Sequence, residues 1–209
     1  DPSKSSRLLA HHESTGFFES TDKADTWQLL AAPGEQGYPS SQGIEKMVIA
    51  PSNGQVIYAS SRAGGSILKS TDGGRNWANY KTGFYNYSNK LAIDPSNPDI
   101  IYAARKYEGA GPSGTPLIRS TDGGVTWEPF VGAGATALSY KAFSVAVGVS
   151  KVYVGTSMGV YESGKSSASW TKLGTGLPNV QVEDLELNES LKILAAGTMG
   201  RGMWRLKLP

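Results

Sequence analysis

The chain has no cysteine and no marked excess of charge of either sign. Without cysteine, its 209 residues cannot form a disulfide, a cysteine-ligated zinc site or a cysteine nucleophile. Its 20 basic and 18 acidic residues leave a net charge of +2, which is too balanced for nucleic acid as the main partner. Like charges do not gather in blocks, so a polybasic membrane anchor is not expected either.

Long apolar runs and helical periodicity are also lacking. No stretch approaches the ~18 apolar residues of a transmembrane segment, and no apolar period of about 3.6 residues predicts a helix. There is no glycine-rich loop that opens a helix and no serine-centred nucleophile elbow, so we expect no cofactor and no bound metal. The chain opens at Asp1 without a signal peptide, and we expect an extracellular or periplasmic protein whose leader has been removed.

What the sequence does contain is a repeated octapeptide. Residues 70–77 (STDGGRNW) recur fifty residues later as residues 120–127 (STDGGVTW). A related copy lies fifty residues upstream at 20–27, and a degenerate one at 163–170 after a step of 43. Two nearly identical octapeptides at a fixed spacing indicate a repeat architecture.

Short apolar segments repeat around each octapeptide, which predicts a unit of four strands, A to D, in about 45 residues. That unit is typical of a β-propeller blade, so we predict an all-β propeller of four-stranded antiparallel blades. The octapeptide joins strand C to strand D, and proline- and asparagine-rich turns join A to B. The expected blades cover residues 1–33, 43–83, 88–131, 141–174 and 180–209 of a single domain.

The first blade offers strands B, C and D only, and the last offers A, B and C only. Two arrangements follow. The chain closes as a five-bladed ring, which we favour because an open arc would expose two blade faces. Alternatively, it is a C-terminal arc of a larger, for example seven-bladed, ring that a missing N-terminal segment or a second chain would complete.

The polar octapeptide residues are interpreted as structural, because a catalytic residue is needed once and these are repeated in every blade. The Asp accepts hydrogen bonds from turn N–H groups, the glycines allow positive φ, and the Trp packs between blades. The alternative, that Asp22, Asp72 and Asp122 are catalytic acids or calcium ligands, is less favoured. The residues assigned to this turn are Ser20, Asp22, Trp27, Ser70, Asp72, Gly74, Trp77, Ser120, Asp122, Gly124, Trp127, Ser163 and Trp170.

These octapeptides resemble the Asp-box (BNR) repeat of sialidases, sortilin-type propellers, xyloglucanase-like glycoside hydrolases and photosystem II assembly-factor propellers. Residues 94–103 and 197–206 also resemble blades of the xyloglucanase-like and sortilin-like groups. The resemblance implies that ligands meet the face built by the B–C and D–A loops, opposite the octapeptides. It is specific for the blade but not for chemistry.

Candidate ligand-binding residues on those loops are His12, Glu13, Arg62, Arg105, Tyr107, Glu108, Tyr85, Tyr87 and Arg201. The adjacent His11 and His12 point to opposite faces of a strand and are a poor metal-chelating pair. Arg62, Arg105 and Arg201 either hold a carboxylate or are solvated loop cations. The tyrosines either form a platform for a sugar or peptide or plug the mouth of the channel.

Three functions remain open. We expect a non-catalytic module that binds a protein, peptide or glycan, without catalytic residues. The first alternative is a glycoside hydrolase, xyloglucanase-like or sialidase-like, or a fragment of one; it requires two carboxylates at a defined separation. Glu13, Glu35, Glu108, Glu183 and Asp184 are available, but none lies in a recognisable catalytic motif. The second alternative is an assembly or scaffold factor.

Overall fold

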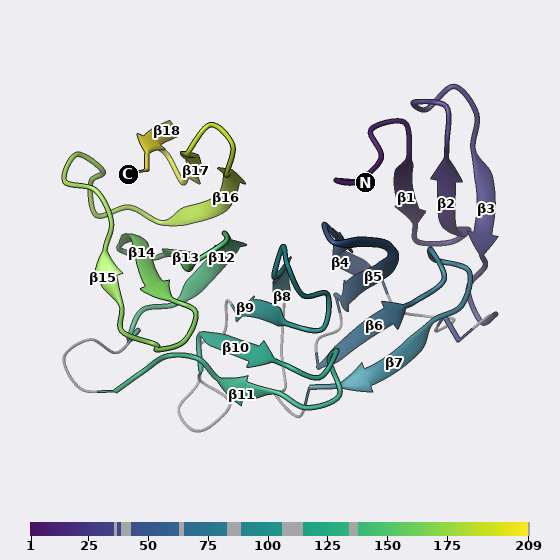
Figure 1. Ribbon diagram of the computed structural model, residues 1–209, viewed down its shortest axis with the longest axis horizontal. Coiled ribbons are helices and arrows are strands. Elements are labelled where there is room, and N and C mark those ends of the chain that lie inside the picture. Colours follow the sequence, from purple (N-terminus) through teal and green to yellow (C-terminus); the bar gives the residue numbers. More distant parts are fainter. Residues whose placement is uncertain are drawn as a thin grey trace. The chain divides into compact units, whose positions relative to one another are not determined.

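The computed structural model describes residues 1–35, 37–38, 43–62, 65–82, 89–105, 115–133 and 138–208. These residues form strands and turns, and no helix occurs among them (Figure 1). The described part of the chain therefore offers no helix that could cross a membrane.

The strands form five antiparallel sheets, numbered here as sheets 1 to 5 in chain order. Sheet 1 contains β1 (Leu8–His12), β2 (Gly16–Ser20) and β3 (Gln28–Ala31). Sheet 2 contains β4 (Ile44–Ala50), β5 (Asn53–Ser61), β6 (Ser66–Ser70) and β7 (Ala78–Lys81), and sheet 3 contains β8 (Asn89–Ile93), β9 (Ile101–Arg105), β10 (Leu117–Ser120) and β11 (Glu128–Pro129). Sheet 4 contains β12 (Ala142–Val147), β13 (Lys151–Thr156), β14 (Gly159–Gly164) and β15 (Thr171–Lys172), and sheet 5 contains β16 (Val182–Asn188), β17 (Ile193–Thr198) and β18 (Gly202–Lys207).

Within every sheet, each strand pairs with the next strand in the sequence. Sheets 2, 3 and 4 have four strands, whereas sheets 1 and 5 have three. The predicted four-strand repeat is therefore confirmed, and so is the prediction that the first and last groups of three strands form separate sheets. Sheet 1 lacks a strand A and sheet 5 lacks a strand D within the described residues.

The octapeptides lie at the same end of each sheet as the A–B turns. A backbone N–H in each octapeptide donates to a carbonyl within two residues of the start of strand B: Lys23 to Ser6, Gly73 to Gln55, Gly123 to Asp99 and Lys165 to Ser150. The B–C loops consequently emerge at the opposite end, where His12, Glu13 and Arg62 lie.

The chain divides into two compact units. Unit 1 comprises Asp1–Ile101 and Ser120–Thr126, and unit 2 comprises Tyr102–Arg119 and Trp127–Pro209. In unit 1 the apolar core packs sheet 1 on sheet 2 and is formed by Phe17, Ala31, Tyr38, Ile44, Ile57, Ala59, Leu68 and Trp77. In unit 2 a second core packs sheet 4 on sheet 5 and is formed by Ala146, Tyr153, Val160, Val182, Leu185, Leu194, Ala196 and Leu208.

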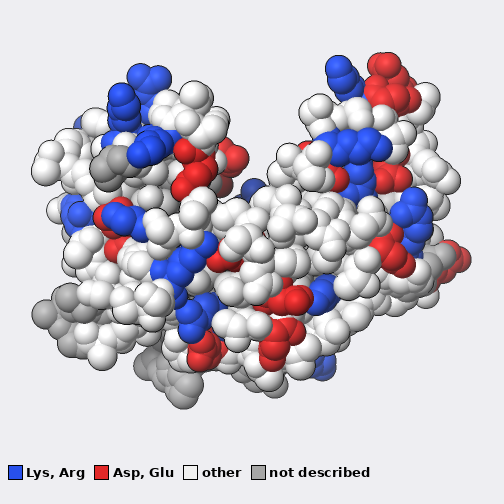
Figure 2. Space-filling model, viewed as in Figure 1, with Lys and Arg blue, Asp and Glu red and all other residues white. Residues whose placement is uncertain are grey.

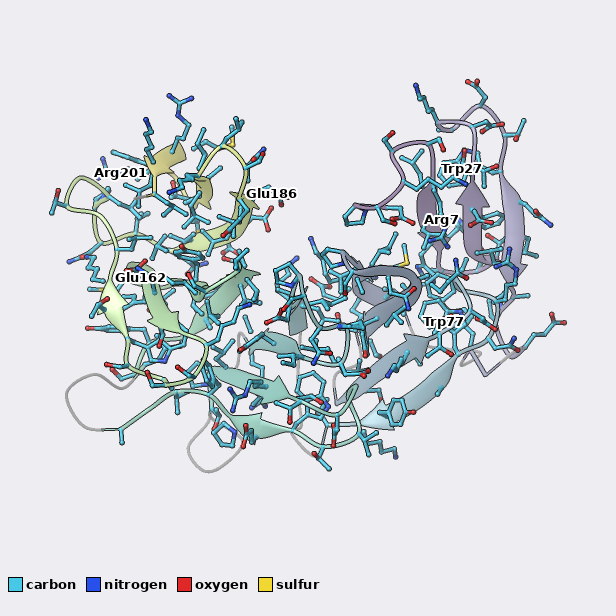
Figure 3. The ribbon with its side chains drawn as sticks, viewed as in Figure 1. Arg7, Trp27, Trp77, Glu162, Glu186 and Arg201 are labelled. Atoms are coloured by element: carbon cyan, nitrogen blue, oxygen red, sulfur yellow. The ribbon has the colours of Figure 1, made fainter. Side chains whose placement is uncertain are left out.

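Two octapeptide tryptophans pack onto the sheet that precedes their own. Trp77, labelled in Figure 3, is 6% exposed. Its ring stacks on that of Phe17 in sheet 1, with centroids 4.3 Å apart. Trp170 is 4% exposed and meets Phe130, which follows β11 of sheet 3, edge to face at 6.0 Å. In both cases the indole supplies a large apolar face between two sheets.

Trp27 departs from that prediction. It remains 43% exposed and has no ring contact among the described residues. The reason is its position: it belongs to sheet 1, and no described sheet precedes sheet 1 in the chain. Trp77 and Trp170 are therefore buried between sheets, whereas Trp27 is not.

Candidate functional site

Three of the octapeptide turns share one hydrogen-bond pattern, centred on the first Ser. In each turn the Ser Oγ donates to the Asp Oδ1 at 2.7–2.8 Å. The same oxygen accepts the N–H of the residue four positions later, at 2.8 Å: Ala24, Gly74 and Gly124 respectively. The serine therefore joins the start of the turn to its middle.

The Asp carboxylates close the second half of each turn. Asp22 and Asp122 each accept two bonds from a Thr, Thr26 and Thr126, through its N–H at 2.9 Å and its Oγ1 at 2.5 Å. These bonds lower the pKa of both carboxyls to about 2. Because their oxygens are committed to the turn, these carboxylates are not available as proton donors in catalysis.

Asp72 has the same role with an amide partner. Asn76 donates to it through its N–H at 2.9 Å and its Nδ2 at 2.7 Å, and Ser70 donates through its hydroxyl. Partial burial opposes ionisation of Asp72, but these hydrogen bonds outweigh it and lower its pKa.

The fourth turn lacks the Asp yet keeps the serine. Ser163 Oγ donates to the carbonyl of Ser167 at 2.7 Å and accepts the N–H of Ser169 at 2.9 Å. Backbone groups thus replace the carboxylate, while the serine still anchors the turn and Trp170 is still buried.

At the opposite end of sheets 1 and 2, two predicted residues meet. Arg62 Nη1 lies 3.6 Å from Glu13 Oε2, and Arg62 Nε lies 4.0 Å from Glu45 Oε2. Glu45 in turn lies 3.5 Å from Lys90 Nζ. We call Glu13, Glu45, Arg62 and Lys90 the charged cluster of unit 1. Since Glu13 and Arg62 are about two-thirds exposed, their pairing is weak and a charged ligand can compete with it.

The backbone fixes the position of this cluster. Arg62 N–H donates to the carbonyl of Gly43 at 2.7 Å, and Ile44 at the start of β4 is paired with Ser61 at the end of β5. At Gly43, a Cβ atom would lie 3.0 Å from Glu13 Oε1. The start of β4 and the end of β5 in sheet 2 therefore converge with the β1–β2 loop of sheet 1 at one edge of unit 1.

Glu45 and Lys90 were not among the predicted site residues. A signal for them was available, because in an antiparallel pair the start of strand A lies beside the end of strand B. Glu45 and Lys90 stand near the starts of β4 and β8, the same end as Arg62.

The two histidines point in different directions, as expected for neighbours on a strand. His11 Nε2 lies 2.6 Å from Tyr38 Oη, and the His11 ring packs 4.9 Å from the Phe17 ring. Burial lowers the pKa of His11, although Glu13 acts in the opposite direction. His12 is exposed, and its Nδ1 lies within hydrogen-bond distance of Ser14 and Thr15. His11 is thus partly buried, and its partner Tyr38 is 2% exposed and belongs to the core of unit 1.

The two other arginines have different surroundings. Arg105 was expected on an exposed loop, whereas its side chain is 1% exposed and its Nη1 donates to the carbonyl of Thr115 at 3.0 Å. Burial also lowers the pKa of Arg105. Arg201 is exposed in the β17–β18 turn. Tyr85, Tyr87, Tyr107 and Glu108 lie outside the described residues.

No metal site is assembled from the described residues. They contain no group of three or more His, Asp or Glu side chains that could hold a metal ion. Glu13 and Glu45 both approach the same guanidinium, whereas a general acid is typically held in apolar surroundings. Figure 2 shows basic and acidic side chains interspersed on the visible face.

Comparison with known proteins places this geometry in context. No protein-family model matches the chain. The xyloglucanase Xgh74A of Acetivibrio thermocellus is 25% identical over 177 residues, 74% of this chain and 20% of the relative. A xyloglucanase of Paenibacillus sp is 28% identical over 189 residues, 75% of this chain and 18% of the relative. The chain spans about a fifth of the length of these curated relatives.

Solved structures resemble the chain over nearly all of its length. The GH74 enzyme of Niastella koreensis gives a TM-score of 0.70 at 20% identity, covering 99% of this chain and 35% of the enzyme. The GH74 xyloglucanase of Xanthomonas campestris gives 0.68 at 19% identity with the same coverages. YCF48 bound to a D1 peptide gives 0.61 at 15% identity, covering 92% of this chain and 59% of YCF48.

The fold is a β-propeller. It is related to the propellers of xyloglucanases, and the sheets found here are the units of that architecture. At these identities the structural likeness shows the fold and not the chemistry.

Proposed function

We propose that this chain is a non-catalytic β-propeller module of the Asp-box type that binds a peptide, protein or glycan through the face opposite the octapeptide turns. The charged cluster of unit 1 is the observation that supports this proposal. It presents the exposed, weakly paired charges of Glu13 and Arg62, with the partly buried Glu45 and Lys90 beside them at the strand ends. The octapeptide carboxylates, in contrast, are occupied by turn hydrogen bonds.

The alternation of charge in the cluster favours a polar ligand with both donors and acceptors. Arg62 offers a planar donor group that suits a carboxylate or paired hydroxyls, and Glu13 accepts hydrogen bonds. The contact between His11 and the buried Tyr38 supports the strand beneath this surface. The same surface suits a sugar chain or a polar peptide.

Binding is measured by calorimetry with two probes, xyloglucan oligosaccharides and a panel of polar peptides. We expect one class to bind saturably and Arg62→Ala to weaken binding about tenfold, equal to about 1.4 kcal/mol. Arg75→Ala is the matched control, because Arg75 is similarly exposed (55% against 62%) but lies at the octapeptide end of the same unit. Equal loss in both variants, or no loss in either, would refute the assigned face.

A glycoside hydrolase, or a piece of one, is the second candidate, because the curated relatives are xyloglucanases. Release of reducing ends from xyloglucan distinguishes the two functions. The binding module predicts none above a buffer control. Turnover that is lost in Glu13→Gln or Glu45→Gln would establish the hydrolase instead.

A role as an assembly factor is a further form of the binding proposal, since one structural neighbour is YCF48 bound to a D1 peptide. We propose an extracellular or periplasmic location from the relation to xyloglucanases. A missing N-terminal segment or a second chain that completes a ring also belongs to this proposal.

A further inference from the structure

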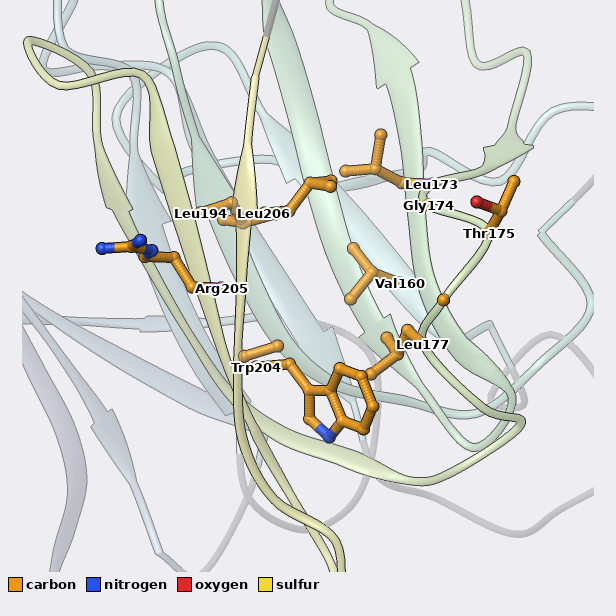
Figure 4. Close-up of a pocket in the computed structure, with 11 residues that line it drawn as sticks. Val160, Leu173, Gly174, Thr175, Leu177, Leu194, Trp204, Arg205 and Leu206 are labelled. Carbon is orange, nitrogen blue, oxygen red and sulfur yellow. The ribbon is translucent and has the colours of Figure 1, made fainter.

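An apolar cavity of about 280 Å³ lies between sheets 4 and 5 of unit 2, beside β18 (Figure 4). Aliphatic side chains form most of its lining, and Thr175, Trp204 and Arg205 contribute its polar side-chain atoms. No carboxylate, carboxamide or histidine lines it. A side chain with chemistry of its own lies instead in unit 1, in the turn between strands A and B of sheet 2.

The A–B turns of sheets 2 and 3 have the same sequence pattern and differ at one important position. Residues 50–56 (APSNGQV) and 94–100 (DPSNPDI) align without a gap, so Asn53 corresponds to Asn97. The next residue is Gly54 in sheet 2 and Pro98 in sheet 3. The pair of Asn53 and Gly54 is the only Asn-Gly pair in the sequence. The chain therefore presents the same asparagine once before glycine and once before proline.

Both asparagines hold their turn through the side-chain oxygen. Asn53 Oδ1 accepts the N–H of Gln55 at 3.0 Å, and Asn97 Oδ1 accepts the N–H of Asp99 at 3.0 Å. Both asparagines are exposed to water. An N–H donor at the amide oxygen stabilises the negative charge that this oxygen gains when its carbon is attacked. The turn thus prepares the carboxamide carbon, Cγ, for a nucleophile.

Only the first turn supplies that nucleophile. Gly54 has a backbone N–H next to Asn53 and no side chain that hinders its approach to Cγ, whereas Pro98 has no N–H. Glycine is also required at position 54 by packing, because a Cβ atom there would lie 2.6 Å from Asp1 Oδ2. The reactive pair is therefore built into the contact between the first residues of the chain and sheet 2.

The carbonyl that follows each asparagine is held by the preceding sheet. Arg7 Nη1, just before β1, donates to the Gly54 carbonyl at 2.6 Å, and Tyr58 Oη of sheet 2 donates to the Pro98 carbonyl at 3.0 Å. Arg7 is 5% exposed and Tyr58 is fully buried. A change in the backbone between Asn53 and Gly54 therefore acts directly on a contact between sheets 1 and 2.

We propose that Asn53 is a site of self-modification, at which the chain deamidates without an enzyme. The Gly54 nitrogen loses its proton and attacks Asn53 Cγ. The new C–N bond closes a five-membered imide, while the Cγ–Nδ2 bond breaks and ammonia leaves with the proton. Water then opens the imide at one of its two carbonyl carbons and leaves aspartate or isoaspartate at position 53. The reaction consumes one water and neither an oxidant nor a reductant.

The two products differ in their effect on the fold. Aspartate keeps the original backbone. Isoaspartate routes the backbone through Cγ and so adds one carbon before Gly54, which moves the Gly54 carbonyl away from Arg7. The isoaspartate form is therefore the less stable one. This site lies at the octapeptide end of unit 1, opposite the charged cluster, so it goes beyond the proposed function and can fail independently of it.

The octapeptides contain two aspartates that precede glycine, but these resist the same ring closure at neutral pH. An aspartyl side chain cyclises as the protonated acid, because water has to leave. Burial raises the pKa of Asp72, but its turn hydrogen bonds outweigh this effect and lower it overall. The hydrogen bonds of the third turn lower the pKa of Asp122 to about 2. Both side chains are thus ionised, and Asn53 is the site expected to react.

The test is incubation of the folded full chain at pH 8 and at pH 6, followed by peptide mapping with mass spectrometry. Acid should form at least tenfold faster at Asn53 than at Asn97. It should also form faster at pH 8 than at pH 6, because the Gly54 nitrogen has to lose its proton first. Pro98→Gly is the matched variant: it creates the same pair in sheet 3 and should raise the rate at Asn97 at least tenfold.

Three outcomes would overturn the proposal: equal rates at Asn53 and Asn97 in the unaltered chain, no increase at Asn97 in Pro98→Gly, or reaction at Asn53 only after unfolding in urea. The effect on the fold is tested separately. The isoaspartate form, isolated by ion exchange, should unfold at a lower urea concentration than Asn53→Asp, which carries the same charge on an ordinary backbone. Equal midpoints would show that the Arg7 contact is not disturbed.

Discussion

Two residues of the first octapeptide turn hold a backbone conformation that usually requires glycine. Lys23 has a φ of 64°, where the other two turns have Gly73 at 77° and Gly123 at 75°, and Ala24 has a φ of 79°, where they have Gly74 at 99° and Gly124 at 91°. The left-handed region costs a residue with a Cβ about 1–2 kcal/mol. The hydrogen bond from Ala24 N–H to Ser20 helps to hold the turn in spite of this cost.

Replacing Ala24 by Gly should therefore stabilise the protein. We expect a gain of about 0.5–1 kcal/mol, because relief of the left-handed strain exceeds the greater entropy that Gly gives the unfolded chain. Urea unfolding at neutral pH measures the change. The reverse substitution, Gly74→Ala, is the control and should destabilise, since its Cβ would lie 3.1 Å from Leu30 Cδ1 at a φ of 99°. A loss of stability in Ala24→Gly would contradict the assignment of strain.

Arg7 is a second residue whose role is visible only in the fold. It is 5% exposed, and its guanidinium contacts Glu19 at 2.6 Å, Asp1 at 2.9 Å and the carbonyls of Gly54 and Gly73. It thus ties sheet 1 to the turns of sheet 2.

Arg7→Ala should cost about 3–5 kcal/mol, because it removes the nearest cation from two carboxylates with little solvent, Asp1 and Glu19, and leaves Glu19 only the longer contact to Arg75 at 3.7 Å. Arg62→Ala, which removes an arginine that is 62% exposed, should cost less than about 1 kcal/mol. Chemical denaturation of the two variants in parallel tests the difference. Similar values would show that the Arg7 network adds nothing beyond an exposed ion pair.

At the scale of whole elements, stability depends on how one sheet packs on the next. Trp77 and Trp27 occupy the same position in their octapeptides, but only Trp77 is covered by a preceding sheet. Comparing the two residues therefore separates the contribution of packing between sheets to the stability from the contribution of the turn.

Trp77→Ala should destabilise by about 3–5 kcal/mol, the usual range for removing a buried aromatic side chain. Trp27→Ala should cost about 1 kcal/mol or less, because that side chain is already nearly half exposed. Thermal unfolding followed by circular dichroism gives both values. If Trp27→Ala were as costly as Trp77→Ala, its face would have to be covered in solution.

At the scale of the molecule, the turn carboxylates give the stability a defined dependence on pH. The folded pKa of Asp22 and Asp122 is about 2, below their ordinary value of 3.8. A depressed pKa contributes stability above the unfolded value, and this contribution is lost as pH falls through the folded value.

The chain should therefore lose stability between about pH 4 and pH 2. The double variant Asp22→Asn with Asp122→Asn should be less stable than the unaltered chain at pH 6 and should change less with pH over that interval. Urea midpoints at pH 2, 3, 4 and 6 test this expectation. Parallel pH profiles for the two proteins would show that other groups control acid unfolding.

Much of the architecture could be predicted from repetition alone. The octapeptides placed the C–D turns, and the apolar segments between them located the strands of every sheet. The individual site residues were harder to predict, because the repeat gives the end of the sheet at which a residue lies but not its burial. Arg62 and Arg105 hold similar places in the repeat, yet one is exposed and the other buried.

The serine that opens each octapeptide has a consequence for tracing this repeat through divergent sequences. The first copy lacks the glycines and the fourth lacks the aspartate, while the hydroxyls of Ser20 and Ser163 still accept a backbone N–H and still donate a hydrogen bond within the turn. The four copies differ at the positions that follow this serine, whereas the serine itself is present in all four. A search profile that gives this hydroxyl and the distant tryptophan the greatest weight should recover degenerate copies that a profile centred on the acidic residue overlooks.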